Sequence, residues 1–416
     1  MTQRKRHINW LLHTDMGNRT ILVAISIAIT VVMLCFSGFR FETICDTGTY
    51  LAAGDVIFSG HLDRLRTPIY PIICHIATSL LQYKGFYLIA LLQLAVFYIS
   101  IIFAHKAACL ALKRRSLRFV AAAIYAWSAS AITFCICPLT ESLTISSVVV
   151  FIYLIFAIIS ARAKRRHYVA VSILLTLMIL LRPFNICFSP VLILAILIGW
   201  KKNQAYRKTT ITSFFTGALV IFAYCATYKA EYGKFNLSSI STINHAIIQS
   251  PNAHFITNAY YELADADSTQ SLLYWQANYS SKEICQADSI FQRNLLQHAT
   301  SRITQFDLST DCYYPVCYSP LNYDYILPLQ SMKLGQIYLV LIVIALCQFY
   351  ILYRKRTHNS HIILILLMIF ATIFTALWGC DNRGYARLMM PMLPCLCLLL
   401  PIFLEQINFR LKTGKE

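Results

Sequence analysis

Long apolar runs recur along the chain, and short polar segments separate them. An α-helix needs about 20 apolar residues to cross the hydrocarbon core of a bilayer. By this measure ten membrane spans are predicted, at residues 20–38, 85–105, 119–137, 143–161, 168–181, 186–200, 211–228, 334–353, 361–378 and 389–404. The pattern therefore predicts an all-α fold, a polytopic transmembrane helical bundle of about ten spans.

A further apolar segment, residues 68–82, is only 15 residues long and begins Pro-Ile-Tyr-Pro. Cytoplasmic loops of membrane proteins carry an excess of Lys and Arg, and this bias tests whether the segment crosses. The basic clusters are Arg4-Lys5-Arg6, Lys113-Arg114-Arg115, Lys164-Arg165-Arg166, Lys201-Lys202, Arg354-Lys355-Arg356 and the tail residues Arg410 and Lys412. All six fall on one side only if 68–82 does not cross. We therefore predict an interfacial helix there, in the first outer loop, with both termini cytoplasmic.

Composition agrees with this picture. Hydrophobic residues make up 58% of the 416 residues and charged residues only 13%, against about 25% in soluble domains. Ordinary soluble enzymes and disordered chains are thereby excluded. The net charge of +18 divides by side: 23 Lys and Arg against 3 acids give +20 on the cytoplasmic face, and 13 against 15 give −2 outside. The excess of basic residues is explained by the membrane topology, so no nucleic-acid partner is predicted.

The outer face has room for a site. We divide the chain into an N-terminal transmembrane module (1–228), a polar extracytoplasmic loop or subdomain (229–333) and C-terminal spans (334–416). The cytoplasmic loops are short and contain no Gly-rich phosphate-binding loop. Chemistry is therefore expected on the outer face. No Cys or His spacing predicts a zinc site, and the pair Asp265 and Asp267 is interpreted as a solvated acidic turn.

Two outer acids are candidates for catalysis. Asp46 follows the first span, before a plausible amphipathic helix from about residue 49 to 58, and it could accept a proton from a hydroxyl. Its alternative role is to cap that helix. Glu141 lies between two spans that have almost no loop between them, where a carboxylate is costly unless it is paired or functional. The alternative is an acid that reaches solvent.

Four outer arginines are candidates for binding phosphate, because the planar guanidinium matches phosphate oxygens. Arg66 stands beside the start of the interfacial helix, and Arg182 interrupts an apolar stretch before Pro183. Arg383 and Arg387 are four residues apart and could share one helical face. Arg383 and Arg387 could instead anchor their helix at the lipid headgroups.

These residues resemble the motifs of the GT-C membrane glycosyltransferases, which include protein mannosyltransferases and the aminoarabinose transferase of lipid A. The resemblance is carried by Asp46-Thr-Gly-Thr-Tyr50, Arg66-Thr-Pro-Ile-Tyr-Pro71, Pro138-Leu-Thr-Glu141-Ser, Arg182-Pro183, and Arg387 with Pro391 and Pro394. It covers most of residues 1–228 and the last spans, and it excludes the loop at 229–333.

The resemblance implies a polyprenyl-phosphate-linked sugar as donor substrate and a glycan, lipid or protein acceptor at the outer face of a bacterial inner membrane. It makes Asp46 the base and places Glu141 near the acceptor or a metal. Arg66, Arg182, Arg383 and Arg387 would bind the donor phosphate, and Tyr50 and Tyr70 would position substrate. Many members carry two adjacent acids in the first loop, whereas Thr47 follows Asp46 here. No cofactor is certain, and a divalent metal is an open alternative.

Three functions remain open from the sequence. The first is sugar transfer from a polyprenyl phosphate. The second is a surface-polysaccharide polymerase or ligase that uses a lipid-pyrophosphate-linked oligosaccharide. The third is a non-enzymatic transporter or assembly scaffold, although ion-coupled transporters carry acids inside their spans and these spans carry almost none.

Overall fold

The computed structural model describes residues 14–36, 45–200, 204–241, 293, 343–348, 350, 359–379, 388 and 390–413. Within these ranges every regular element is a helix, which confirms the all-α prediction. In chain order the elements up to residue 200 are α2 (Asp15–Phe36), α3 (Cys45–Phe58), α4 (Ile69–Leu81), η1 (Gln82–Lys84), α5 (Gly85–Ala111), α6 (Arg115–Ala126), α7 (Ala129–Ile136), α8 (Thr140–Ile159), α9 (Arg165–Leu181), η2 (Pro183–Phe188) and α10 (Ser189–Trp200). They are followed by η3 (Gln204–Tyr206), α11 (Arg207–Tyr232), α19 (Ser360–Gly379), η5 (Met390–Met392) and α21 (Leu393–Thr413).

Five helical stretches are long and apolar enough to cross a membrane, which indicates an integral membrane protein. Shorter apolar helices occur at Ser360–Ala376 and Met390–Gln406. Eight of the ten predicted spans coincide with described helices, the span at 119–137 is divided between two helices, and most of the span at 334–353 lies outside the described residues. The total of ten and the side of the membrane on which each loop lies stay predictions.

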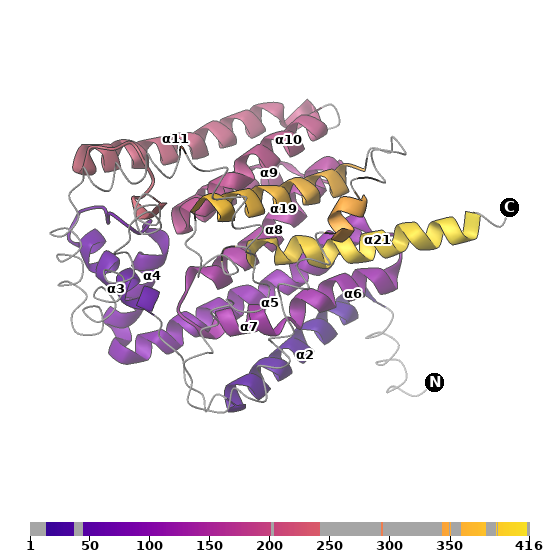
Figure 1. Ribbon diagram of the computed structural model, residues 1–416, viewed down its shortest axis with the longest axis horizontal. Helices are drawn as coiled ribbons and strands as arrows, with labels where there is room; N and C mark the ends of the chain where they lie inside the picture. Colours follow the sequence, from indigo (N-terminus) through magenta and orange to yellow (C-terminus); the bar gives the residue numbers. More distant parts are fainter. Residues whose placement is uncertain are drawn as a thin grey trace.

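Helices α5 and α8 form the centre of the bundle, where they pack against each other. In α8, 83% of the most apolar stretch is buried, whereas the figure for α11 is 11%. A helix that is apolar all round is suited to a central position, and an outlying helix in a membrane protein exposes its apolar face to lipid. Helix α11 packs on α9 at the edge of the bundle, and α3 and α4 lie together at one end (Figure 1).

The short helix α4 folds back along the start of α5. Gln82 (φ 50°) breaks the chain between them. At Gly85 an added Cβ would lie 2.5 Å from the carbonyl oxygen of Ala77, so only glycine permits this close approach. Further along, Tyr70 of α4 contacts Gln93 of α5. Helix α4 is therefore a separate 13-residue helix beside the first turns of α5. Whether this helix lies at the membrane interface, as the sequence predicts, stays a prediction.

The predicted span at 119–137 is wrong as a single helix, because the structure divides it into α6 and α7. Ser128 begins α7, and its hydroxyl accepts a hydrogen bond from the backbone N–H of Ala131. The carbonyl of Ala126, at the end of α6, accepts a hydrogen bond of 2.8 Å from Ser26 of α2. These two serines provide hydrogen bonds that the interrupted helix would otherwise lack.

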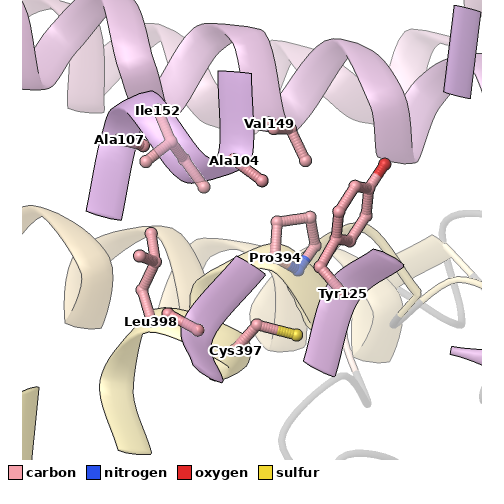
Figure 2. A pocket seen from close by; sticks show the side chains of 9 residues that line it. Ala104, Ala107, Tyr125, Val149, Ile152, Pro394, Cys397 and Leu398 are labelled. Atoms are coloured by element: carbon pink, nitrogen blue, oxygen red, sulfur yellow. The ribbon is translucent and has the colours of Figure 1, made fainter. Parts of the chain in front are cut away.

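At the end of the bundle away from α3 and α4, helix α21 packs against α6. Glu405 of α21 accepts hydrogen bonds from the backbone N–H groups of Lys113 and Arg114, just before α6 begins. A small apolar pocket between α5, α6, α8 and α21 is lined by alanines and by Tyr125, Pro394 and Cys397 (Figure 2). This pocket shares no residue with the site described below.

The predicted boundary at residue 228 falls within α11, which continues to Tyr232 and ends at Gly233 (φ 74°). Such a left-handed residue is typical of a helix end. The chain then returns to the first outer loop, where the N–H of Ser239 donates to the carbonyl of Arg64. Residues 242–292 and 294–342 lie outside the described residues, so the extracytoplasmic loop stays a prediction.

Candidate functional site

The first and second of the predicted outer loops meet through one face of α3. The hydroxyl of Thr47 lies 3.4 Å from the carbonyl oxygen of Pro138, and the hydroxyl of Tyr50 lies 3.3 Å from that of Thr140. Thr47, Tyr50 and Thr140 are all buried. The segment after the first span is therefore docked on the start of α8, next to Glu141.

Arg66 packs on the same face of α3. Its guanidinium lies over the Tyr50 ring, 4.4 Å from the ring centre, in cation–π geometry. Nε donates to the hydroxyl of Thr49 at 3.0 Å, and Nη1 donates to the hydroxyl of Tyr50 at 3.4 Å. These contacts orient the guanidinium over the Tyr50 ring.

Asp63 shapes the turn that carries Arg66. One carboxylate oxygen accepts hydrogen bonds from the backbone N–H groups of Leu65, at 2.8 Å, and Arg66, at 2.5 Å. Asp63 is only 2% exposed. Burial raises the pKa of its carboxyl group above the usual 3.8, while the backbone hydrogen bonds and the nearby Arg66 charge oppose that rise. An aspartate that bonds the backbone N–H groups two and three residues ahead is a common way to fix a turn.

Glu141 and Arg182 form a buried ion pair between the second and third outer loops. Nη1 of Arg182 lies 3.1 Å from Oε1 of Glu141, an ionic contact without the alignment of a hydrogen bond. The Glu141 side chain is fully buried and that of Arg182 is 12% exposed. The other carboxylate oxygen of Glu141 lies 3.3 Å from the hydroxyl of Thr140, which donates to it. The charge of Arg182 is thus balanced within the protein.

Tyr70 of α4 packs against Tyr50 and connects it to α5. Its ring meets the Tyr50 ring edge-on, with 4.8 Å between the ring centres, and its hydroxyl donates to Oε1 of Gln93 at 2.8 Å. The amide nitrogen of Gln93 in turn donates to carbonyl groups at the end of α7, among them Cys137 at 2.6 Å. Tyr70 and Gln93 are both fully buried. Gln93 therefore ties α4, α5 and α7 together beneath Tyr50.

We call the connected side chains the outer network, after the side of the membrane predicted for their loops; its members are Thr49, Tyr50, Arg66, Thr140, Glu141 and Arg182. Four of the predicted site residues, Tyr50, Arg66, Glu141 and Arg182, come together in it although the sequence separates them widely. Its described side chains include two guanidinium groups and one carboxylate, and the Asp63 carboxylate lies near Arg66.

The remaining predicted site residues differ in how far the structure describes them. Asp46 is the second residue of α3, one turn before Tyr50, and its side chain lies outside the described residues. Because α3 begins at Cys45, Asp46 belongs to the helix itself rather than to the position before it. Arg383 and Arg387 also lie outside the described residues. Tyr70 contacts Tyr50 and Gln93, and its contact with substrate stays a prediction.

Sequence reasoning missed several residues that build the site. Thr49, Thr140 and Asp63 are ordinary loop and helix-start residues, and nothing in the sequence shows which arginine they face. Gln93 did carry a signal, because an amide inside an apolar span needs hydrogen-bond partners. The partners themselves, three carbonyl groups 41 to 44 residues away, were not visible in the sequence.

A metal at the outer network stays an open alternative, because the side chain of Asp46 lies outside the described residues. Glu141 is the only carboxylate among the network's described side chains, and it is already ion-paired with Arg182. In the described part of the chain, the one group with metal-ligand geometry is Asp15, His105 and Cys109, and it shares no residue with the network. Arg19 donates to Nδ1 of His105 at 3.3 Å, and its charge opposes cation binding there.

Comparison with known structures places the fold. The chain is similar to the archaeal oligosaccharyltransferase AglB from Archaeoglobus fulgidus, in complex with an inhibitory peptide and a dolichol-phosphate, with a TM-score of 0.53 and 12% identity over 98% of this chain and 52% of that one. The crystal structure of the Archaeoglobus fulgidus oligosaccharyltransferase in the apo form gives a TM-score of 0.54, with the same identity and coverage.

The chain spans about half the length of these two structures. At 12% identity the likeness shows a shared fold alone, and the resemblance to the GT-C glycosyltransferases stays a prediction. Neither protein-family models nor curated protein sequences gave a match to this chain.

Proposed function

We propose that the chain is a membrane glycosyltransferase that moves a sugar from a polyprenyl-phosphate-linked donor to an acceptor hydroxyl at the outer network. The observation that carries the proposal is the meeting of Tyr50, Arg66, Glu141 and Arg182, which come from three separate outer loops. The shared fold with an oligosaccharyltransferase supports it.

The reaction needs a base and a group that stabilises the leaving phosphate. The acceptor oxygen forms a bond to the anomeric carbon, the bond from that carbon to the phosphate oxygen breaks, and the acceptor proton passes to a carboxylate. We assign the proton to Asp46, which begins the helix that carries Tyr50. We assign to Arg66 the role of stabilising the negative charge that develops on the leaving phosphate. No step in this scheme runs through a metal.

The ion pair assigns a different role to Glu141. One carboxylate oxygen of Glu141 contacts the guanidinium of Arg182, and the other accepts a hydrogen bond from the Thr140 hydroxyl. We therefore propose that Glu141 holds Arg182 and the start of α8 in position, beneath the surface on which substrate binds.

The test is transfer of a labelled sugar from a polyprenyl phosphate by protein reconstituted in vesicles. Asp46→Asn should abolish transfer, while Asp55→Asn should leave it unchanged. Asp55 is the matched control because it lies on the same helix, is 73% exposed and pairs with His75 at 2.8 Å. Full activity of Asp46→Asn would remove Asp46 as the base.

A second candidate is transfer of a whole oligosaccharide from a lipid pyrophosphate, because both similar structures are oligosaccharyltransferases. Supplying single-sugar and oligosaccharide donors in parallel, with peptide and glycan acceptors, separates the two. Turnover of the oligosaccharide donor alone would favour the second candidate.

A further inference from the structure

The loop that carries Arg66 is held from its far side by the end of α11. We call residues 59–68, between α3 and α4, the Arg66 loop. The hydroxyl of Tyr228 donates to the carbonyl of Arg64 at 3.0 Å, and the hydroxyl of Tyr232 donates to the carbonyl of Leu62. A carboxylate oxygen of Glu231 accepts from the N–H of Leu62 at 2.9 Å. Three side chains on one helical turn thus bind the backbone of this loop.

The segment after α11 adds a second layer to the clamp. Ser239 donates its backbone N–H to the carbonyl of Arg64 at 2.9 Å, and its hydroxyl lies 2.5 Å from that of Tyr228. Since a phenol has a single proton, which Tyr228 gives to Arg64, the Ser239 hydroxyl is the donor in this pair. Tyr228 is fully buried and Ser239 is 9% exposed, so water cannot readily replace these bonds.

Asp63 fixes the same loop from within, through its bonds to the N–H groups of Leu65 and Arg66. Connecting loops are ordinarily among the more mobile parts of a protein. Here, residues 62, 64, 65 and 66 all have backbone groups bonded to Asp63, α11 or Ser239. These bonds fix the backbone directly before the guanidinium that packs over Tyr50.

We propose that Asp63 and Tyr228 are positioning residues that hold the Arg66 guanidinium over Tyr50, ready for the donor phosphate. The inference rests on the role proposed above for Arg66. It also links the site to the segment that follows α11, because Ser239 belongs to both the clamp and the start of the predicted extracytoplasmic loop.

The chain offers a matched control on the same helix. Tyr224 lies one turn before Tyr228, and its buried hydroxyl has no hydrogen-bond partner in the described part of the structure. Tyr224→Phe and Tyr228→Phe remove the same atom from neighbouring turns of α11. Only Tyr228→Phe removes a bond to the Arg66 loop. For Asp63, Asp63→Asn keeps an oxygen that can accept from Leu65 and Arg66, whereas Asp63→Ala does not.

The experiment measures the Kd of a polyprenyl phosphate for the full chain in lipid nanodiscs. Tyr228→Phe and Asp63→Ala should each weaken binding about 10-fold, as expected for the loss of one or two buried hydrogen bonds. Asp63→Asn should stay within about 3-fold of wild type, and Tyr224→Phe should bind as wild type does. In an Arg66→Ala background, Tyr228→Phe should have no further effect, because it acts through Arg66.

The outcomes separate the inference from the proposed function. If Arg66→Ala binds the polyprenyl phosphate as tightly as wild type, the proposed function and the inference both fail. If Arg66→Ala weakens binding but Tyr228→Phe does not, the inference alone is overturned. The same holds if the two effects multiply in the double variant. Should Asp63→Ala not fold, Tyr228→Phe with its Tyr224→Phe control carries the test.

Discussion

The buried pair of Glu141 and Arg182 allows a quantitative test of how the outer loops are held. In Glu141→Gln the amide can still accept from Thr140, but Arg182 keeps a charge in a place where its side chain is only 12% exposed. Removal of one partner from a buried ion pair costs about 3–5 kcal/mol. Because Arg182 has some access to solvent, we expect about 3 kcal/mol, or roughly 5 °C in the apparent Tm.

The assay is thermal unfolding of the purified protein in nanodiscs at one fixed heating rate, since membrane-protein unfolding is commonly irreversible. The double variant Glu141→Gln/Arg182→Met should regain most of the loss, because it leaves no unpaired buried charge. Asp55→Asn removes an acid that is 73% exposed and should change the apparent Tm little. The reasoning is refuted if Glu141→Gln is as stable as wild type, or if the double variant is no more stable than the single one.

Three further predictions follow from other parts of the fold. Because burial raises the folded-state pKa of Asp63 above 3.8, the folded protein binds this proton more tightly than the unfolded chain. Wild type should therefore gain stability relative to Asp63→Asn as the pH falls through that raised pKa toward 3.8; a difference in apparent Tm that does not vary with pH would contradict this. Gly54→Ala should destabilise the protein by about 1–3 kcal/mol, because its Cβ would lie 2.8 Å from Cβ of His75 and 2.9 Å from the carbonyl oxygen of Pro71. Gly48→Ala on the same helix meets nothing within 4 Å and serves as the control, and equal apparent Tm values for the two variants would argue against close packing of α3 on α4. Glu405→Ala should cost about 1 kcal/mol, since it removes the acceptor for the backbone N–H groups of Lys113 and Arg114. Glu405→Gln should retain part of that stability in the same unfolding assay, and no loss in either variant would show that α21 is held elsewhere.

The sequence by itself determined the helical class, most span positions and which loops carry the candidate residues. Hydrophobic length is a local property: a run of about 20 apolar residues is long enough to cross a bilayer as a helix. Periodicity likewise predicted a helix near residues 49–58, and the structure has α3 there. The break between α6 and α7 was not predictable, because the hydrogen bond from Ser26 that supports it comes from a residue 100 positions away.

Tertiary structure decided which of the candidate residues work together. From the sequence, Glu141 and Arg182 were two separate polar residues near a membrane, each with an alternative role. Their pairing depends on the packing of α8 against α9, which puts the start of one helix beside the end of the other. The same packing buries the pair, so that Glu141 balances the charge of Arg182. The guanidinium of Arg66 packs instead over the ring of Tyr50. Asp63 and Tyr228 acquire their proposed roles only because the end of α11 lies against the Arg66 loop. The length of an apolar segment depends on consecutive residues and can be read from the sequence. Burial, ion pairing and the choice of hydrogen-bond partner depend on contacts between residues far apart in the sequence.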